Sequence, residues 1–180
     1  MFDFFFASIF VLFFNINWFI FLLSVLIPYK IKTHKGTPGF SIIIPNADSG
    51  PVIGKTLETI RASNYPQNKI EIILIDSTGK MSSIAKKYKA ILLKDRKAMG
   101  KGHAVNLGIK KAKNEILYFL DSDTLVEKDT IRNIALSISK KTPVVMGVLL
   151  PVNRKGLTTF MARLELILLN SSGYWFARVL

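Results

Sequence analysis

The chain has 180 residues, no cysteine, and 25 Lys+Arg against 12 Asp+Glu, which gives a formal net charge of +13. This length suits one compact domain with an accessory segment, and the absence of cysteine excludes disulfides, thiolate metal sites and a cysteine nucleophile. The positive charge favours an anionic partner, which can be nucleic acid, an acidic membrane face or a phosphorylated substrate. Hydrophobic residues make up 49% and the mean hydropathy is +0.32, so part of the apolar surface is expected to meet lipid or a partner.

The N-terminal stretch, residues 4–27, contains 24 residues without a charge and is rich in phenylalanine. A helix of this length, at about 1.5 Å per residue, would cross a hydrocarbon core of roughly 30 Å. A cleaved signal peptide would need a basic N-terminal flank, but only Asp3 precedes the stretch, whereas Lys30, Lys32 and Lys35 follow it. By the positive-inside rule we expect a single-pass membrane anchor with a cytosolic body.

The body of the chain alternates between segments with strand character and segments with helix character. Apolar, β-branched runs predict strands over residues 40–45, 70–75, 90–93, 115–120 and 143–149. Helical spacing predicts helices over residues 52–62, 82–89, 101–113 and 128–139. Strands that are apolar on both faces and alternate with helices form a mainly parallel sheet covered on both sides. The sequence therefore predicts an α/β fold of the Rossmann-like type behind one N-terminal transmembrane helix.

Carboxylates follow three of the predicted strands. Asp48 comes after the first, Asp76 after the second, and Asp121 with Asp123 after the fourth. Each of them alone is explained by a turn or a helix N-cap, but ligands of such sheets bind outside the carboxyl ends of the strands. Four carboxylates at this edge, in a chain this basic, favour a functional cluster.

Asp121 and Asp123 are two residues apart where an extended chain leaves the sheet, so both carboxylates are expected to face one site. Two oxygen ligands that are completed by substrate phosphates suit Mg²⁺ or Mn²⁺. The sequence therefore predicts a divalent cation at this pair.

A glycine-flanked basic turn, residues 99–106 (MGKGHAVN), opens a predicted helix. Backbone N–H groups at a helix start, together with Lys101, favour an anion such as a diphosphate. His103 is expected to be an ordinary residue of the first helical turn.

A second candidate phosphate loop, residues 49–56 (SGPVIGKT), nearly matches the Walker A pattern, with Asp121 at the end of a possible Walker B. Ser49 replaces its first glycine, and Pro51 removes an N–H from the loop. A P-loop nucleotidase is therefore the alternative interpretation.

Taken together, these segments resemble the family 2 glycosyltransferases with a GT-A fold. The matching segments are SIIIPNADSG (residues 41–50), ILIDSTGK (73–80), GKGHAVNLGIKKAKNEILYFLDSDT (100–124) and VVMG (144–147). The third segment is the most specific, because its glycine-lysine turn, Asn106 and the D-x-D occur in the order and spacing of the family. The resemblance covers roughly residues 40–153.

The resemblance implies a site for a nucleotide-sugar donor. Asp76 matches the second-strand aspartate that contacts the nucleotide base, and Asp123 matches the metal-binding aspartate, with Asp121 as its neighbour on Mg²⁺ or Mn²⁺. The residues implied in donor binding are Pro45, Asp48, Asp76, Lys101, Asn106 and Asp121.

Two departures from the family pattern concern the base. Ser77 replaces the second aspartate of D-D-x-S, and NADS (residues 46–49) replaces the usual Y-N-E, so UDP and GDP both stay open as the nucleotide. Family members take their catalytic base from an acidic motif well downstream of the D-x-D, and this chain has no match. We therefore assign no catalytic base and expect the chain to be the N-terminal part of a longer enzyme.

These observations combine into one expected organisation. Residues 1–35 are the anchor and its basic flank, residues 36–153 the GT-A domain, and residues 154–180 an apolar interfacial or acceptor-side segment. The expected activity is metal-dependent, inverting transfer of a hexose from a UDP- or GDP-sugar to a lipid-linked or polysaccharide acceptor at the cytosolic membrane face. A P-loop NTPase and a catalytically silent, membrane-bound GT-A partner are the alternatives. Nucleic acid is not an expected partner, because no nucleic-acid-binding module is recognisable.

Overall fold

A computed structural model describes residues 2–26, 36–47, 50–147, 149–152 and 155–164. The chain divides into two compact units. Residues 32–145 form the unit that contains the sheet, and the residues before and after them form the other.

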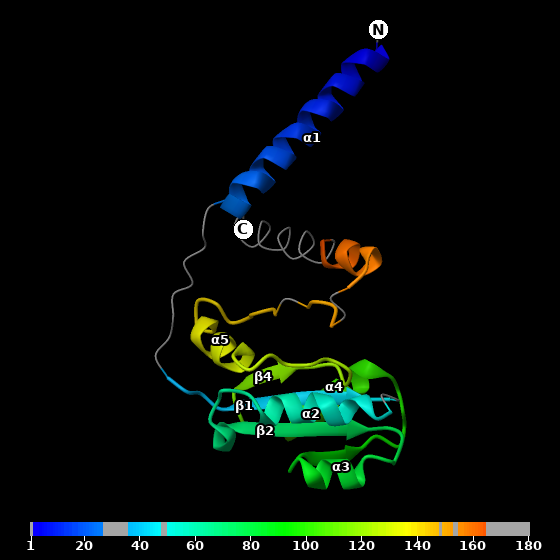
Figure 1. The fold of residues 1–180 in the computed structure, drawn as a ribbon, viewed down its shortest axis with the longest axis vertical. Coiled ribbons are helices and arrows are strands. Elements are labelled where there is room, and N and C mark those ends of the chain that lie inside the picture. The colour runs from blue at the N-terminus through cyan, green and yellow to red at the C-terminus, as the bar shows by residue number, and fades with distance from the viewer. Residues whose placement is uncertain (1, 27–35, 48–49, 148, 153–154, 165–180) are drawn as a thin grey trace. The chain divides into compact units, whose positions relative to one another are not determined.

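The sheet has four strands in the order β3-β2-β1-β4, and all of its pairs are parallel (Figure 1). The strands are β1 (Phe40–Asn46), β2 (Ile70–Asp76), β3 (Ile91–Lys94) and β4 (Ile116–Phe119). Their carboxyl ends meet at one edge of the sheet, where Asn46 is paired with Asp76 and Asp76 with Lys94. This confirms the predicted α/β architecture with a parallel sheet.

Helix α1 (Phe2–Leu26) precedes the first strand. Helices follow the four strands as the sequence predicts, and they are α2 (Val52–Arg61), α3 (Ser82–Lys87), α4 (Lys101–Lys111) and α5 (Thr130–Ser137), with a 3₁₀ helix at Gln67–Lys69. Most predicted boundaries within residues 36–145 agree to about two residues, as is usual for helix ends that fray.

The two faces of the sheet carry separate cores. Alternate residues of β1 point to opposite faces, so Ile42 packs with Leu57 of α2 and Ile131 of α5, whereas Ile43 packs with Ala104 of α4. The isoleucines and Leu57 are completely buried, and each such side chain stabilises the fold by about 1.5–3 kcal/mol relative to an exposed one.

Close packing against the sheet places α4 beside the strand ends. A Cβ atom at Gly108 would lie 2.5 Å from Cγ2 of Ile43 and 3.1 Å from Cδ1 of Ile75. Glycine therefore allows an approach that a larger residue would prevent, and the start of α4 at Lys101 is thereby set at the carboxyl edge of the sheet.

Helix α1 exposes most of the side chains that are described, including Phe10 and Phe13. Asn15 and Asn17 each donate a hydrogen bond of 2.7 Å from Nδ2 to the carbonyl four residues earlier, so both amides are satisfied within their own helix. In the part of the chain that the structure describes, no helix meets the length and hydropathy needed to cross a membrane. The predicted transmembrane anchor is therefore not supported.

The predicted strand over residues 143–149 is wrong. The described residues of this stretch form no strand, and Val144 and Met146 are 82% and 74% exposed. The run is apolar, but it pairs with none of the four strands, and Pro143 has no N–H to donate to a ladder. Residues 157–164 are helical, and residues 165–180 of the predicted apolar segment lie outside the described residues.

Candidate functional site

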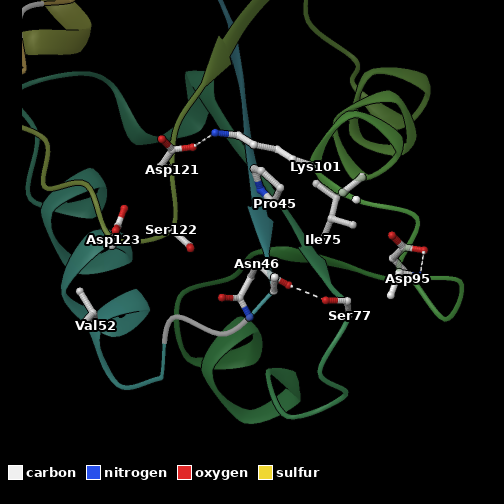
Figure 2. Close-up of a pocket in the computed structure, with 14 residues that line it drawn as sticks. Pro45, Asn46, Val52, Ile75, Ser77, Asp95, Lys101, Asp121, Ser122 and Asp123 are labelled. Atoms are coloured by element: carbon white, nitrogen blue, oxygen red, sulfur yellow. Dashed lines mark hydrogen bonds and ion pairs between the residues drawn. The ribbon is translucent and has the colours of Figure 1, made fainter.

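A cavity of about 600 Å³ lies at the carboxyl edge of the sheet, where the aspartates were predicted to gather (Figure 2). Its lining comes from the ends of β1 and β2, the segment that joins β3 to α4, the first turn of α4, the loop after β4, and the start of α2. The lining residues are Pro45, Asn46, Ala47, Val52, Ile75, Ser77, Asp95, Ala98, Gly100, Lys101, Ala104, Asp121, Ser122 and Asp123.

The two aspartates of the D-x-D motif line this cavity from the loop after β4. Leu120 is buried, and its N–H donates to a carbonyl of β1, which fixes where the loop begins. Thr56, a buried residue of α2, donates from Oγ1 to the carbonyl oxygen of Ser122 at 2.9 Å. The loop is thus held through its backbone, and Asp121 and Asp123 are left exposed toward a ligand.

The segment that resembles a Walker A loop has a structural role in the fold. Thr56 stands at the position of the Mg²⁺-binding Ser/Thr of a P-loop, yet its hydroxyl is bonded to the loop that carries the D-x-D. Lys55 is not among the residues that line the cavity. Residues 48–49, which would belong to the phosphate loop, lie outside the described residues. The described part of the segment therefore supports the D-x-D loop.

Lys101 begins α4 and lines the same cavity. Its Nζ forms an ion pair with the carboxylate of Asp121, and both side chains are more than half exposed (Figure 2). Gly100 precedes the helix with φ of 92°, and no side chain in the described residues caps the first turn. The free N–H groups of this turn and Lys101 therefore offer a binding place for an anion beside the two aspartates.

Asp95, which lines the cavity, forms a side-chain pair with His103. The Asp95 side chain is 4% exposed, and its Oδ2 lies 3.2 Å from Nδ1 of His103 in the first turn of α4. Its Oδ1 accepts hydrogen bonds from the N–H groups of Lys97 and Ala98, at 3.2 and 3.3 Å. The Asp95 carboxylate thus ties the loop after β3 to the start of α4, which carries Lys101.

Sequence reasoning missed this pair. Asp76 and Asp121 directly follow their predicted strands, whereas Lys94 separates Asp95 from the strand predicted over residues 90–93. In the structure β3 ends at Lys94, so Asp95 does follow a strand directly. His103 was expected to be an ordinary helix residue, and its partner lies eight positions earlier in a different element.

Asp76, the last residue of β2, is buried and does not line the cavity. Its Oδ1 accepts from the N–H and Oγ1 of Thr78, at 2.8 and 2.6 Å, and its Oδ2 accepts from the N–H of Met81 at 3.0 Å. Burial raises the pKa of this carboxyl, but the hydrogen bonds to Thr78 and Met81 outweigh burial and hold the pKa below its usual value. Ser77 lines the cavity in its place, and a contact of Asp76 with the base stays a prediction.

The other predicted donor residues are placed as follows. Pro45 lines the cavity, whereas Asn106 lies exposed within α4 and is not part of the lining. Asp48 lies outside the described residues. No group of three or more His, Cys, Asp or Glu that could hold a metal ion occurs in the part of the chain that is described.

A parallel α/β sheet with a ligand cavity at the carboxyl ends of its strands defines a nucleotide-binding class of fold. The sequence profile of the family described as Glycosyl transferase family 2 matches residues 41–178, which is most of the chain. The protein therefore belongs to glycosyl transferase family 2, which confirms the resemblance seen in its motifs.

Individual relatives agree with this assignment. The poly(ribitol-phosphate) beta-N-acetylglucosaminyltransferase TarS of Staphylococcus aureus (strain Mu50) is 29% identical over 143 residues, which cover 73% of this chain and 25% of TarS. A solved mannosyltransferase, PcManGT from Pyrobaculum calidifontis in complex with GDP-Man and Mn²⁺, matches with a TM-score of 0.59 and 25% identity, over 66% of this chain and 38% of that one.

The crystal structure of S. aureus TarS 1-349 in complex with UDP matches with a TM-score of 0.50 and 25% identity, over 54% of this chain and 31% of that one. The chain thus spans about a quarter of the length of TarS.

Proposed function

We propose that this protein is a glycosyltransferase that moves a hexose from a nucleoside diphosphate sugar to a lipid-linked or polysaccharide acceptor. The observation that carries the proposal is the placement of Lys101, Asp121 and Asp123 around one cavity. The family assignment supports it, as do the solved relatives that hold GDP-Man or UDP.

The donor fits the cavity in size and in charge. Ligand sites typically enclose about 300–1,000 Å³, and this cavity has about 600 Å³. We assign the diphosphate to the start of α4, where Lys101 and the uncapped N–H groups of the first turn are available. UDP and GDP both remain candidates for the nucleotide.

The residues present also fit a divalent cation. Asp121 and Asp123 would hold Mg²⁺ or Mn²⁺ through their carboxylates, and diphosphate oxygens and water would complete the shell, as these cations prefer. PcManGT, the relative solved with GDP-Man, also contains Mn²⁺. When bound, such a cation neutralises the charge that develops on the leaving diphosphate.

The transfer itself is proposed as a single displacement. An acceptor hydroxyl oxygen forms a bond to the anomeric carbon, the bond from that carbon to the diphosphate oxygen breaks, and the hydroxyl proton passes to a base. Lys101 stabilises the departing nucleoside diphosphate, because its ammonium group lies at the cavity. One displacement inverts the anomeric configuration, and no residue of this chain is assigned as the base.

We also propose that the protein works at the cytosolic face of a membrane and contacts it through α1. The exposed aromatic and aliphatic side chains of this helix support the proposal, as does the basic flank Lys30, Lys32 and Lys35. Flotation of the full chain with phosphatidylcholine–phosphatidylglycerol vesicles is expected to carry it to the top of the gradient. Recovery of all protein at the bottom would contradict membrane contact.

Calorimetric titration of the full chain tests the proposed activity class. The nucleotides are UDP, GDP, ATP and GTP, each with and without Mn²⁺, for the wild type, Asp123→Ala and Lys55→Ala. We expect Mn²⁺-dependent binding of UDP or GDP that is lost in Asp123→Ala and kept in Lys55→Ala. Binding of ATP or GTP that requires Lys55 and survives Asp123→Ala would establish the P-loop alternative instead. Absence of nucleotide binding by the wild type would favour a silent GT-A partner.

A further inference from the structure

The positive charge of the chain is concentrated in one segment. Residues 77–114 contain 11 Lys+Arg and a single acidic residue, Asp95, whereas the rest of the chain contains 14 Lys+Arg and 11 Asp+Glu. Asp95 is buried, and its oxygens are taken up by His103 and by the N–H groups of its own loop. The surface of this segment therefore carries almost only positive charge.

Part of this charge lies at the edge of the sheet that holds the cavity. Lys94 ends β3 opposite Asp76, and the N–H of Asp95 donates to the Asp76 carbonyl at 2.9 Å, so the turn after β2 and the loop after β3 leave the sheet side by side. Lys80 belongs to that turn, and Arg96 and Lys97 belong to that loop. We call these four basic residues, Lys80, Lys94, Arg96 and Lys97, the cationic rim.

The cationic rim adjoins the lining of the cavity. Asp95 and Ala98 line the cavity on either side of Arg96 and Lys97, and Ser77 lines it from the turn that contains Lys80. The rim side chains themselves are exposed and are not part of the lining. The loop that carries Arg96 and Lys97 and the turn that carries Lys80 therefore border the cavity, and Lys94 ends the strand before that loop.

No acidic side chain among the described residues neutralises the charges of the rim. Within the part of the chain that the structure describes, Asp121 is paired with Lys101 and Asp95 with His103, and the four rim side chains make no ion pair or hydrogen bond. Lys94, Arg96 and Lys97 lie within four residues of the chain, and Lys80 belongs to the turn beside their loop. Exposed cations gathered in this way repel one another and attract a polyanion, and this attraction weakens as salt is added.

We propose that the cationic rim binds the acceptor and that this acceptor is a phosphate-bearing polymer, such as a chain of phosphodiester-linked polyol or sugar units. The inference rests on the proposed transferase function and adds to it the chemical class of the acceptor. The donor already has its own cationic partners in Lys101 and the start of α4, which do line the cavity. A polymer with regularly spaced negative charges can contact several rim side chains at once while its end enters the cavity.

The test compares two variants of the full chain with equal loss of charge. The rim variant carries Lys80→Gln, Lys94→Gln, Arg96→Gln and Lys97→Gln. The matched control replaces four exposed basic residues around α5, as Lys128→Gln, Arg132→Gln, Lys140→Gln and Lys141→Gln. Fluorescence anisotropy with labelled poly(ribitol phosphate), without donor, gives the Kd of each protein at low and high salt, and an uncharged N-acetylglucosamine oligomer is the neutral probe.

We expect the wild type and the control to bind poly(ribitol phosphate) and the rim variant to bind it about tenfold more weakly or worse, with little binding of the neutral oligomer by any of them. Equal loss of polymer binding in the rim and control variants would overturn the inference, as would rim-dependent binding to phosphatidylglycerol vesicles without binding to the polymer.

Mn²⁺-dependent UDP or GDP binding is measured in parallel. If the rim variant still binds the nucleotide, its donor site is intact. If none of the three proteins binds nucleotide, that result counts against the proposed function, and the polymer binding is then judged separately.

Discussion

Two strands at the same edge of the sheet have an aspartate at or just past their carboxyl end, yet the two sites differ in environment. Asp76, the last residue of β2, is 2% exposed and accepts three hydrogen bonds from Thr78 and Met81 in the turn that follows. After β4, Asp121 and Asp123 are exposed and line the cavity.

The difference arises from which groups hold each loop in place. The turn after β2 uses its own N–H and hydroxyl donors, and these converge on the Asp76 carboxylate. The loop after β4 is held by Thr56 of α2 through the backbone carbonyl of Ser122, which leaves the neighbouring carboxylates available. An aspartate after a strand therefore contributes to stability in one case and to ligand binding in the other.

The largest expected effect is on donor binding. Asp123→Asn removes a negatively charged oxygen ligand from the proposed cation site. Mn²⁺-dependent binding of UDP or GDP should therefore weaken by roughly 100-fold or more, since mutation of even an outer-shell partner can lower metal affinity by up to about 100-fold. The free energy of unfolding should change by no more than about 0.5 kcal/mol, since the side chain is exposed. Calorimetry and urea unfolding measure the two quantities. Glu127→Gln, an exposed carboxylate of the same connection, should leave both unchanged.

Asp76→Asn should lower the stability of the fold more than it weakens nucleotide binding. The amide cannot accept on both sides as the carboxylate does, so the loss of charge-assisted hydrogen bonds in a buried turn should lower the free energy of unfolding by about 1–3 kcal/mol. Urea unfolding at neutral pH measures this change. An unaltered stability, together with a loss of nucleotide binding, would instead assign Asp76 to the ligand.

The pH dependence of stability sharpens the same contrast. The pKa of Asp76 is lowered in the folded protein relative to its ordinary value of 3.8. Its ionised form therefore stabilises the fold above that ordinary value, and this contribution is lost as the pH falls through the lower pKa of the folded state. Between neutral pH and strong acid, the wild type should lose more stability than Asp76→Asn. Parallel acid curves for the two proteins would show that Asp76 does not make this contribution.

The position of α4 can be disturbed without touching either loop. Gly108→Ala would press a Cβ atom against Ile43 and should destabilise the fold by about 1–3 kcal/mol. Gly102→Ala, in the same helix, has no neighbour within 4 Å of the new Cβ and should be neutral or stabilising by up to about 1 kcal/mol. Thermal or urea unfolding of the pair measures the difference, and equal effects would mean that α4 is not closely packed on the sheet.

The smallest expected effect on nucleotide binding concerns His103, which we regard as a positioning residue. His103→Ala removes the tie between Asp95 and α4, so Lys101 should be held less firmly and nucleotide binding should weaken by roughly tenfold or less. The free energy of unfolding should fall by about 1–3 kcal/mol, because the buried Asp95 carboxylate loses the partner of its Oδ2. His103→Asn, which keeps a nitrogen donor near the Asp95 carboxylate, should restore part of the affinity. A stability loss without any change in nucleotide binding would assign the pair a purely structural role.

The sheet was largely predictable from the sequence, because β1 and β2 are apolar on both faces and local composition reports this directly. The stretch over residues 143–149 has the same composition, yet it is not a strand among the described residues. Composition records how apolar a segment is, but it does not record whether an adjacent strand is present to take up its hydrogen bonds.

Site residues were predictable where their placement depends on near neighbours in the sequence, and not where it depends on other parts of the fold. Asp121 and Asp123 share the cavity as predicted. The extended chain expected between them is wrong, because they lie in a turn closed by the N–H of Thr124 donating to the Asp121 carbonyl at 3.1 Å. Lys101 was found because a helix start is visible in the sequence. Asp95 was missed and the burial of Asp76 was not foreseen, because both depend on donors supplied by neighbouring backbone or by another element. Such partners follow from the folded loop and not from the order of residue types.

The most direct test of the account is anomalous diffraction from crystals of the protein grown with Mn²⁺ and UDP or GDP. The account predicts a manganese peak beside the carboxylates of Asp121 and Asp123, with the diphosphate at the start of α4 within reach of Lys101. Nucleotide bound at the start of α2 against Lys55, with no manganese at the D-x-D loop, would contradict it.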